Sequence, residues 1–129
     1  MQTILLIENT GDILGNFTLY LEMEGYTVLK ANNGKKGIEL AVECMPDIII
    51  CDVSIPGLSS YDVLQIIKES PKTAVIPFIL SASTSEKVDT SKANKLGADN
   101  YLERSFDPET LLGLIRTEIK KSRSLTLHV

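Results

Sequence analysis

The chain has 129 residues, 43% of them hydrophobic and 23% charged, and its net charge at pH 7 is −4. This length suffices for one domain with one hydrophobic core, and the acidic balance disfavours sequence-independent binding of nucleic acid. The apolar runs all fall short of the roughly 20 residues that a membrane-spanning helix needs.

Segments typical of strands and helices alternate five times along the chain. Short apolar runs bounded by turn residues predict strands at 3–7, 26–31, 47–52, 77–83 and 98–104. Apolar residues at three- and four-residue spacing predict helices at 11–24, 34–45, 61–69 and 85–96, and a last helix that begins at Pro108 with Asp107 as its N-cap. The helix at 85–96 has the fewest apolar residues and is expected to be loosely held.

Strict alternation with short connections implies a parallel sheet covered by helices on both faces. Five such units fit the flavodoxin-like doubly wound fold, a five-stranded parallel sheet in the order 2-1-3-4-5 with five helices. We expect residues 1–121 to form this domain. Residues 122–129 are expected to be a frayed end or the start of a linker rather than an added strand.

The most informative segment is the apolar run 48–51, which leads directly into Asp52. The turn-forming pair Pro56-Gly57 follows shortly after it. An unbroken apolar run of this kind indicates a strand buried on both faces, with Asp52 at its carboxyl end. In open α/β sheets this edge binds ligands, so Asp52 is a candidate site residue. The alternative is that Asp52 only caps a backbone turn.

Polar groups that follow the other strands are expected to converge on Asp52, and these are Glu8, Asn9, Ser81 and Arg104. The carboxylates of Glu8 and Asp52, with the carbonyl oxygens of Asn9 and Ser54, are the hard oxygen ligands that Mg²⁺ takes. Ser81 supplies a hydroxyl, and Arg104 supplies a cation able to hold a phosphate through two parallel hydrogen bonds. The set suits phosphoryl transfer to Asp52, although Glu8 could be a solvated acid and Ser81 could bond its own backbone.

Four segments resemble the receiver domains of two-component response regulators, and the resemblance covers about residues 3–120. Asp52-Val53-Ser54-Ile55-Pro56-Gly57 resembles the family's Asp-x-x-Met-Pro-Gly, and Ser81-Ala82 resembles its Thr/Ser-Ala pair. Gly97-Ala98-Asp99-Asn100-Tyr101-Leu102 is similar to Gly-Ala-Asp-Asp-Tyr-Leu, and Asp107-Pro108-Glu109-Thr110-Leu111 resembles the opening of the family's final helix. Together these segments are highly specific.

The resemblance implies that a histidine kinase or phosphotransfer protein phosphorylates Asp52, with Mg²⁺ held by Glu8, Asp52 and the Ser54 carbonyl. Ser81 and Tyr101 then form a switch pair, although Tyr101 could equally be a half-buried strand aromatic. The protein is expected to be a signalling receiver, not an enzyme beyond catalysing its own phosphorylation and dephosphorylation.

The implied partners are that kinase and an output domain or target protein, with no direct contact to nucleic acid or membrane. A homodimer through the face of the fourth helix, fifth strand and fifth helix is a further expectation from the resemblance. The chain is either a stand-alone receiver or one cut from a larger protein.

Three positions depart from the family's pattern. Asn9 stands where the family has the second residue of an acidic pair, so we expect Mg²⁺ binding to weaken without being lost. Arg104 replaces a lysine, which keeps the charge but changes its reach. Ser105 replaces a proline that often follows a cis bond, and a cis bond before serine costs about 3–4 kcal/mol.

These departures motivate an alternative: a pseudo-receiver that binds partners without phosphorylation, with Arg104 paired to Asp52. A flavin-binding enzyme on the same sheet order is a poorer alternative. The loop Glu8-Asn9-Thr10-Gly11-Asp12 is acidic and is not the phosphate-binding cradle that the cofactor needs.

The cysteines and the amino terminus favour the cytoplasm. Cys44 and Cys51 are seven residues apart and the chain has one histidine, so no zinc pattern or disulfide framework is indicated. The first residues lack the charged-then-apolar layout of a signal peptide.

Overall fold

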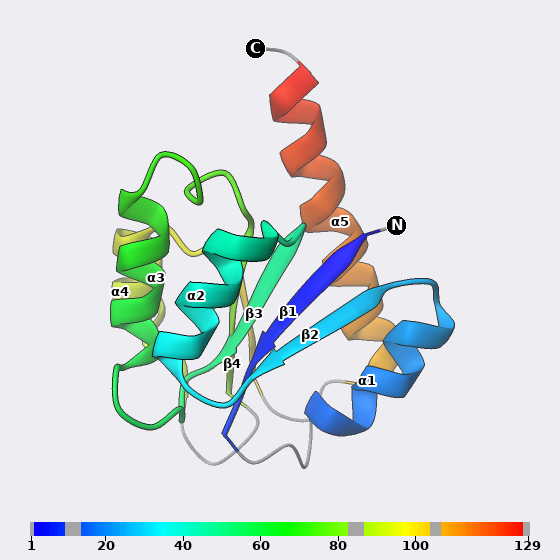
Figure 1. Ribbon diagram of the computed structural model, residues 1–129, viewed down its shortest axis with the longest axis horizontal. Helices are drawn as coiled ribbons and strands as arrows, with labels where there is room; N and C mark the ends of the chain where they lie inside the picture. Colours follow the sequence, from blue (N-terminus) through cyan, green and yellow to red (C-terminus); the bar gives the residue numbers. More distant parts are fainter. Residues whose placement is uncertain (1, 10–13, 83–86, 104–106, 128–129) are drawn as a thin grey trace.

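The computed structural model describes residues 2–9, 14–82, 87–103 and 107–127, which form a parallel sheet covered by helices (Figure 1). The strands are β1 Thr3–Ile7, β2 Thr27–Ala31, β3 Ile48–Asp52, β4 Phe78–Ala82 and β5 Asn100–Glu103. The helices are α1 Leu14–Met23, α2 Gly34–Cys44, α3 Ser60–Glu69, α4 Thr90–Leu96 and α5 Pro108–Leu127. Neighbouring strands are parallel, in the order β2-β1-β3-β4-β5, which confirms the predicted flavodoxin-like doubly wound fold.

Alternating side chains along the strands divide the core into two layers. On β1, Leu5 and Ile7 point to the face covered by α2, α3 and α4, whereas Ile4 and Leu6 point to the face covered by α1 and α5 (Figure 1). Every residue of β3 and β4 is buried. The unbroken apolar run before Asp52 therefore reflects a strand covered on both faces, as predicted.

The amino end of α5 is capped as the sequence predicts. Asp107 Oδ1 accepts a hydrogen bond from the Thr110 backbone N–H at 2.7 Å, and Pro108 is the first helical residue. The Thr110 backbone hydrogen bond lowers the pKa of the Asp107 carboxyl, because it stabilises the charged form.

Two helices differ from their predicted bounds. Helix α4 begins at Thr90 because Asp89 caps it, accepting from the Lys92 N–H at 3.0 Å; residues 83–86 lie outside the described part of the chain. Helix α5 continues to Leu127, through residues expected to fray or to begin a linker, since no glycine or proline follows Gly113. Within the described ranges, no helix is both long and apolar enough to cross a membrane.

The Gly-Ala-Asp segment that opens β5 has a structural role at the amino-terminal end of the sheet. Gly97 ends α4 in the left-handed conformation, with φ 92°. Asp99 Oδ2 accepts from the Phe78 N–H at 2.7 Å and from Lys68 Nζ at 2.9 Å.

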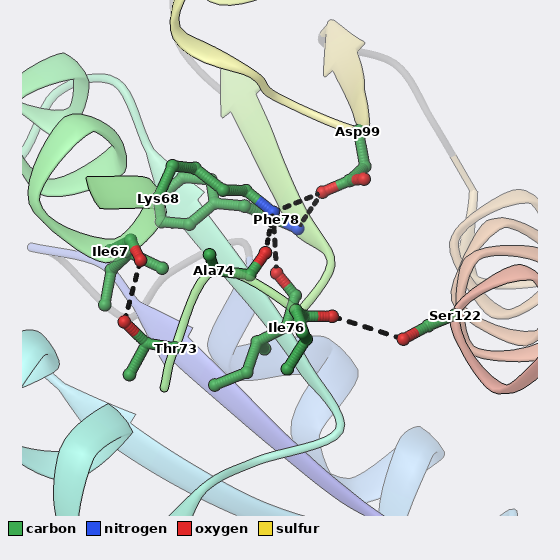
Figure 2. A network of polar contacts seen from close by, with 9 residues as sticks. Ile67, Lys68, Thr73, Ala74, Ile76, Phe78, Asp99 and Ser122 are labelled. Atoms are coloured by element: carbon green, nitrogen blue, oxygen red, sulfur yellow. Dashed lines mark hydrogen bonds and ion pairs between the residues drawn. The ribbon is translucent and has the colours of Figure 1, made fainter. Parts of the chain in front are cut away.

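Lys68, at the end of α3, also donates to the carbonyls of Ala74 and Ile76 at 3.2 and 2.9 Å (Figure 2). The Lys68 side chain is 17% exposed. The ion pair between Lys68 and Asp99 is therefore better shielded from solvent than a surface pair. The starts of β4 and β5 are thereby fastened to α3.

The close approach of α2 to β1 is testable at Gly37, where a Cβ would lie 2.8 Å from Ile7 Cγ1. We expect Gly37→Ala to lower the free energy of unfolding by about 1–2 kcal/mol, since overpacking outweighs the gain in helix propensity. The matched control is Gly113→Ala on the exposed face of α5, where a Cβ meets nothing within 4 Å. It should raise stability by about 0.5–1 kcal/mol. Urea unfolding measures both, and an equal effect of the two substitutions would contradict this packing.

Candidate functional site

Three polar residues form a row across β1, β3 and β4 at the carboxyl edge of the sheet. The register pairs Ile7 with Cys51, so Glu8 follows at the level of Asp52, and Asp52 is itself paired with Ser81. Paired residues of neighbouring strands point to the same face. Since Ile50, two residues before Asp52, packs beneath α1 and α5, the row belongs to that face.

All three members of this row are buried. The exposed fraction is 7% for Glu8, 6% for Asp52 and 0% for Ser81. The Glu8 N–H donates to the Ala31 carbonyl at 2.9 Å, which holds Glu8 against β2 beyond the end of β1. Two carboxylates taken out of water at adjacent strand ends favour a nearby cation, because like charges oppose each other's ionisation.

Asp52 also forms the turn that leaves β3. Its Oδ1 accepts from the Ser54 N–H at 3.0 Å, and the Val53 N–H donates to the Ser81 carbonyl at 2.9 Å. The turn-capping alternative is therefore present in the structure. A carboxylate has about four acceptor positions, so this bond does not by itself exhaust the capacity of Asp52.

The sequence predicts Ser54 as a carbonyl ligand, and the structure shows that its N–H is the backbone donor of the turn-capping alternative. The spacing of an aspartate and the N–H two residues later is that of an Asx-turn, and this signal was available in the sequence. The bond fixes the orientation of the carboxyl group.

The Ser81 hydroxyl is buried and finds no hydrogen-bond partner among the described residues. The alternative in which it bonds its own backbone is therefore wrong. Leaving a buried hydroxyl unsatisfied costs about 1–3 kcal/mol, and such a group in a native site calls for an explanation. Its place beside Asp52 in the register makes the hydroxyl a candidate donor to a group held at Asp52.

Tyr101 is not part of this row. Ser81 is paired with Leu102, and Tyr101 is paired with Leu80, so Tyr101 lies on the opposite face of the sheet from Ser81. It is 38% exposed. The structure thus places the predicted switch pair on neighbouring strands without bringing the two side chains together.

The other predicted site residues lie at or beyond the limits of the described chain. Asn9 directly follows Glu8 and is exposed. Arg104 and Ser105 lie outside the described residues, and so does the peptide bond between them.

The donor set is compatible with Mg²⁺, which commonly binds one or two carboxylates and keeps several waters. Glu8 and Asp52 supply the carboxylates, and Asn9 and Ser54 can add neutral oxygens. In the described part of the chain, no group of three or more His, Cys, Asp or Glu residues could hold a metal ion.

Cys51 lies next to Asp52 in the chain but does not add a second nucleophile. Its side chain is buried and its Sγ lies 3.7 Å from the Asp52 carbonyl oxygen, to which it donates. Burial, and to a smaller extent the negative charge of Asp52, raises the pKa of the Cys51 thiol. The thiol is therefore protonated at neutral pH and unreactive.

Comparison with known proteins agrees with this arrangement. The family described as the response regulator receiver domain matches residues 4–116. Protein PilH of Pseudomonas aeruginosa is 32% identical over 115 residues, which cover 89% of this chain and 95% of PilH. The DNA-binding dual master transcriptional regulator RpaA of Synechocystis is 33% identical over 122 residues, covering 95% of this chain.

This chain spans about half the length of RpaA, 51%. Among solved structures, the receiver domain of sensor histidine kinase PA1611 from Pseudomonas aeruginosa matches with a TM-score of 0.82 at 23% identity. The match covers 92% of this chain and 98% of that one, and that structure is described with a magnesium ion coordinated in its active site cleft.

The different environments of the two cysteines test the burial of the strand that carries Asp52. In the native protein we expect iodoacetamide to modify the exposed Cys44 and to leave the buried Cys51 unmodified. The reaction requires a cysteine that is deprotonated and that the reagent can reach. Peptide mapping measures the sites, and denatured protein, in which both cysteines should react, is the control. Modification of Cys51 in the native protein at the rate of Cys44 would contradict the buried site.

Proposed function

The chain belongs to the response regulator receiver family, and on this premise we propose that Asp52 accepts a phosphoryl group from a histidine kinase or phosphotransfer protein. Receiver domains are signalling modules of two-component systems rather than conventional enzymes. The observation that carries the proposal is the buried Ser81 hydroxyl in register with Asp52, which has no partner among the described residues. A phosphoryl oxygen on Asp52 supplies the missing acceptor.

The proposed transfer needs one nucleophile. A carboxylate oxygen of Asp52 attacks phosphorus, the new O–P bond forms as the bond from phosphorus to the donor breaks, and the donor leaves with the bonding electrons. The Ser54 N–H holds the carboxyl group at 3.0 Å, so the attacking group is oriented beforehand. Ser81 then donates to the transferred group, and Arg104 is proposed to compensate its charge.

Receiver domains generally bind Mg²⁺, and here Glu8, Asp52, the Ser54 carbonyl and Asn9 are the proposed ligands. When bound, the ion supplies charge neutralisation as carboxylate and phosphoryl oxygens approach each other. The buried carboxylates of Glu8 and Asp52 support this assignment. The magnesium ion described in the related PA1611 receiver gives further support.

Phosphorylation is proposed to shift a two-state equilibrium at the face formed by α4, β5 and α5. Receiver domains act through histidine kinases and output domains, and we propose this face as the contact for the output domain, a target or a second copy. In this scheme Ser81 moves toward the phosphoryl group and Tyr101, 38% exposed in this structure, turns inward. A cytoplasmic location is proposed because Cys44 and Cys51 are both free.

A pseudo-receiver is the second candidate, and the donor set is the observation that favours it. Only Glu8 and Asp52 contribute acids to the described row, and Asn9 is neutral. If Arg104 provides the permanent cation for Asp52, partner binding needs no phosphorylation.

Beryllofluoride, which mimics a phosphoryl group on aspartate, distinguishes the two candidates. With millimolar Mg²⁺ we expect it to shift amide resonances of residues 52–54, 81–82 and 100–103, because the mimic accepts the Ser81 hydrogen bond. Asp52→Asn should abolish the shifts. Wild-type protein that shows no shift, while an Asn9→Asp variant responds, would favour the pseudo-receiver.

The neutral side chain at position 9 sets the expected affinity for the ion. One added unit charge near a divalent cation is worth about 2 kcal/mol at high dielectric, so Asn9→Asp should tighten Mg²⁺ binding by roughly 10- to 30-fold. Calorimetric titration measures this affinity. Gln65→Glu, on the exposed side of α3, controls for net charge, and an equal gain in that variant would argue against Asn9 as a ligand.

A further inference from the structure

Helix α4 is held weakly by apolar packing. It has seven residues, of which Ala93 is buried and Leu96 packs partly buried against the same core layer. The other buried contact near its start is Val88, which precedes the helix and joins the core layer beneath α2, α3 and α4. A helix this short needs other contacts to fix its position, since isolated helices of this length are not stable.

Two side chains from other elements bind the backbone just before α4. The Tyr61 hydroxyl, from α3, accepts a hydrogen bond from the Asp89 N–H at 2.7 Å. A carboxylate oxygen of Glu103, from the end of β5, accepts from the Val88 N–H at 3.3 Å. Adjacent N–H groups are thus held by α3 on one side and by β5 on the other.

The Tyr61 contact is reinforced within α4. Asp89, whose N–H binds Tyr61, also caps the helix through the Lys92 N–H. The Lys92 ammonium lies 5.0 Å from the centroid of the Tyr61 ring, within the range of a cation–π interaction. The ring of Tyr61 packs against the same core layer as Val88, so the anchor is itself fixed.

We propose that Tyr61 and Glu103 position the start of α4 through their bonds to the Asp89 and Val88 amides, a pair of contacts that we name the α4 clasp. The strength of the α4 clasp then sets how readily the receiver switches. The proposal rests on the proposed function and adds a means of regulating it.

The α4 clasp is adjacent to the site through strand register. Glu103 is paired with Ala82, the residue after Ser81. Val88 and Asp89 follow β4 after one short connection. We infer that a displacement of Ser81 toward a phosphoryl group reaches Glu103 through the pairing of β4 with β5, and the α4 clasp opposes it by holding α4 in the arrangement seen here.

Tyr61→Phe tests the α4 clasp, because it keeps the ring, its packing and its contact with Lys92 while removing the accepting oxygen. In the protein without beryllofluoride, we expect amide hydrogen exchange at Asp89 and along α4 to accelerate about two- to tenfold, the range for one hydrogen bond. Glu103→Ala should do the same at Val88. The urea midpoint should fall by no more than the loss of this one hydrogen bond accounts for, whereas a defect of the core would lower it further.

The second readout is switching itself. A looser α4 lowers the cost of the alternative arrangement, so Tyr61→Phe should tighten the apparent affinity for beryllofluoride by about two- to tenfold. Tyr26→Phe is the matched control, because it removes a hydroxyl from the core layer beneath α1 and α5. It should leave both α4 exchange and affinity unchanged.

The outcomes separate the two proposals. Unchanged exchange along α4 in Tyr61→Phe overturns the α4 clasp, and so does faster exchange with unchanged beryllofluoride affinity. If exchange accelerates as expected but the wild-type protein never responds to beryllofluoride, Tyr61 and Glu103 do position α4, whereas the control of switching by the α4 clasp and the proposed function are both overturned.

Discussion

The register of three parallel strands is the constraint on which the site depends. Pairing Ile7 with Cys51 and Asp52 with Ser81 sets Glu8, Asp52 and Ser81 in one buried row. A slip of one residue would move each of these side chains to the opposite face. The register is enforced by the core itself, because Ile50 and Ile79 occupy the layer beneath α1 and α5 while Cys51 and Leu80 occupy the other.

The two ends of the sheet differ in how firmly they are held. At the amino-terminal end, Lys68 and Asp99 tie the starts of β4 and β5 to α3 through an ion pair and backbone hydrogen bonds (Figure 2). At the carboxyl end, α4 depends on the buried Ala93, on the partly buried Leu96 and on single hydrogen bonds to the residues before the helix. The weaker contacts of the sheet, those of the α4 clasp, therefore lie at the same end as the proposed phosphoacceptor. This is expected for an element that switches, because such elements have low local stability.

Much of this architecture could be predicted from the sequence, because hydrophobic periodicity and turn residues report directly on burial. The strand order, the buried strand before Asp52 and the Asp107 cap were all predicted correctly. The extent of α5 beyond residue 121 was not, since the polar residues 120–124 gave no apolar pattern there, although nothing in them stops a helix. The start of α4 at Thr90 is set by the local Asp89 cap, whereas the position of the residues before it depends on Tyr61 and Glu103, which local patterns do not encode.

The sequence predicts which residues form the site more fully than it predicts how their side chains are arranged. The convergence of Glu8, Asp52 and Ser81 follows from strand order, which the alternation of elements already implied. That Ser81 would find no partner among the described residues and that Tyr101 would face away from Ser81 depend on register and three-dimensional packing, whereas the bond from the Ser54 N–H to Asp52 is local. The roles of Glu8, Asp52 and Ser81 are proposals that rest on this placement.

The central claim is that Asp52 is a phosphoacceptor, and intact-mass analysis tests it most directly. Wild-type protein incubated with Mg²⁺ and a small phosphodonor should gain the mass of one phosphoryl group, sensitive to hydroxylamine as an acyl phosphate is, and Asp52→Asn should gain none. Unmodified wild-type protein at saturating Mg²⁺ and donor, or a modified Asp52→Asn variant, would contradict the account.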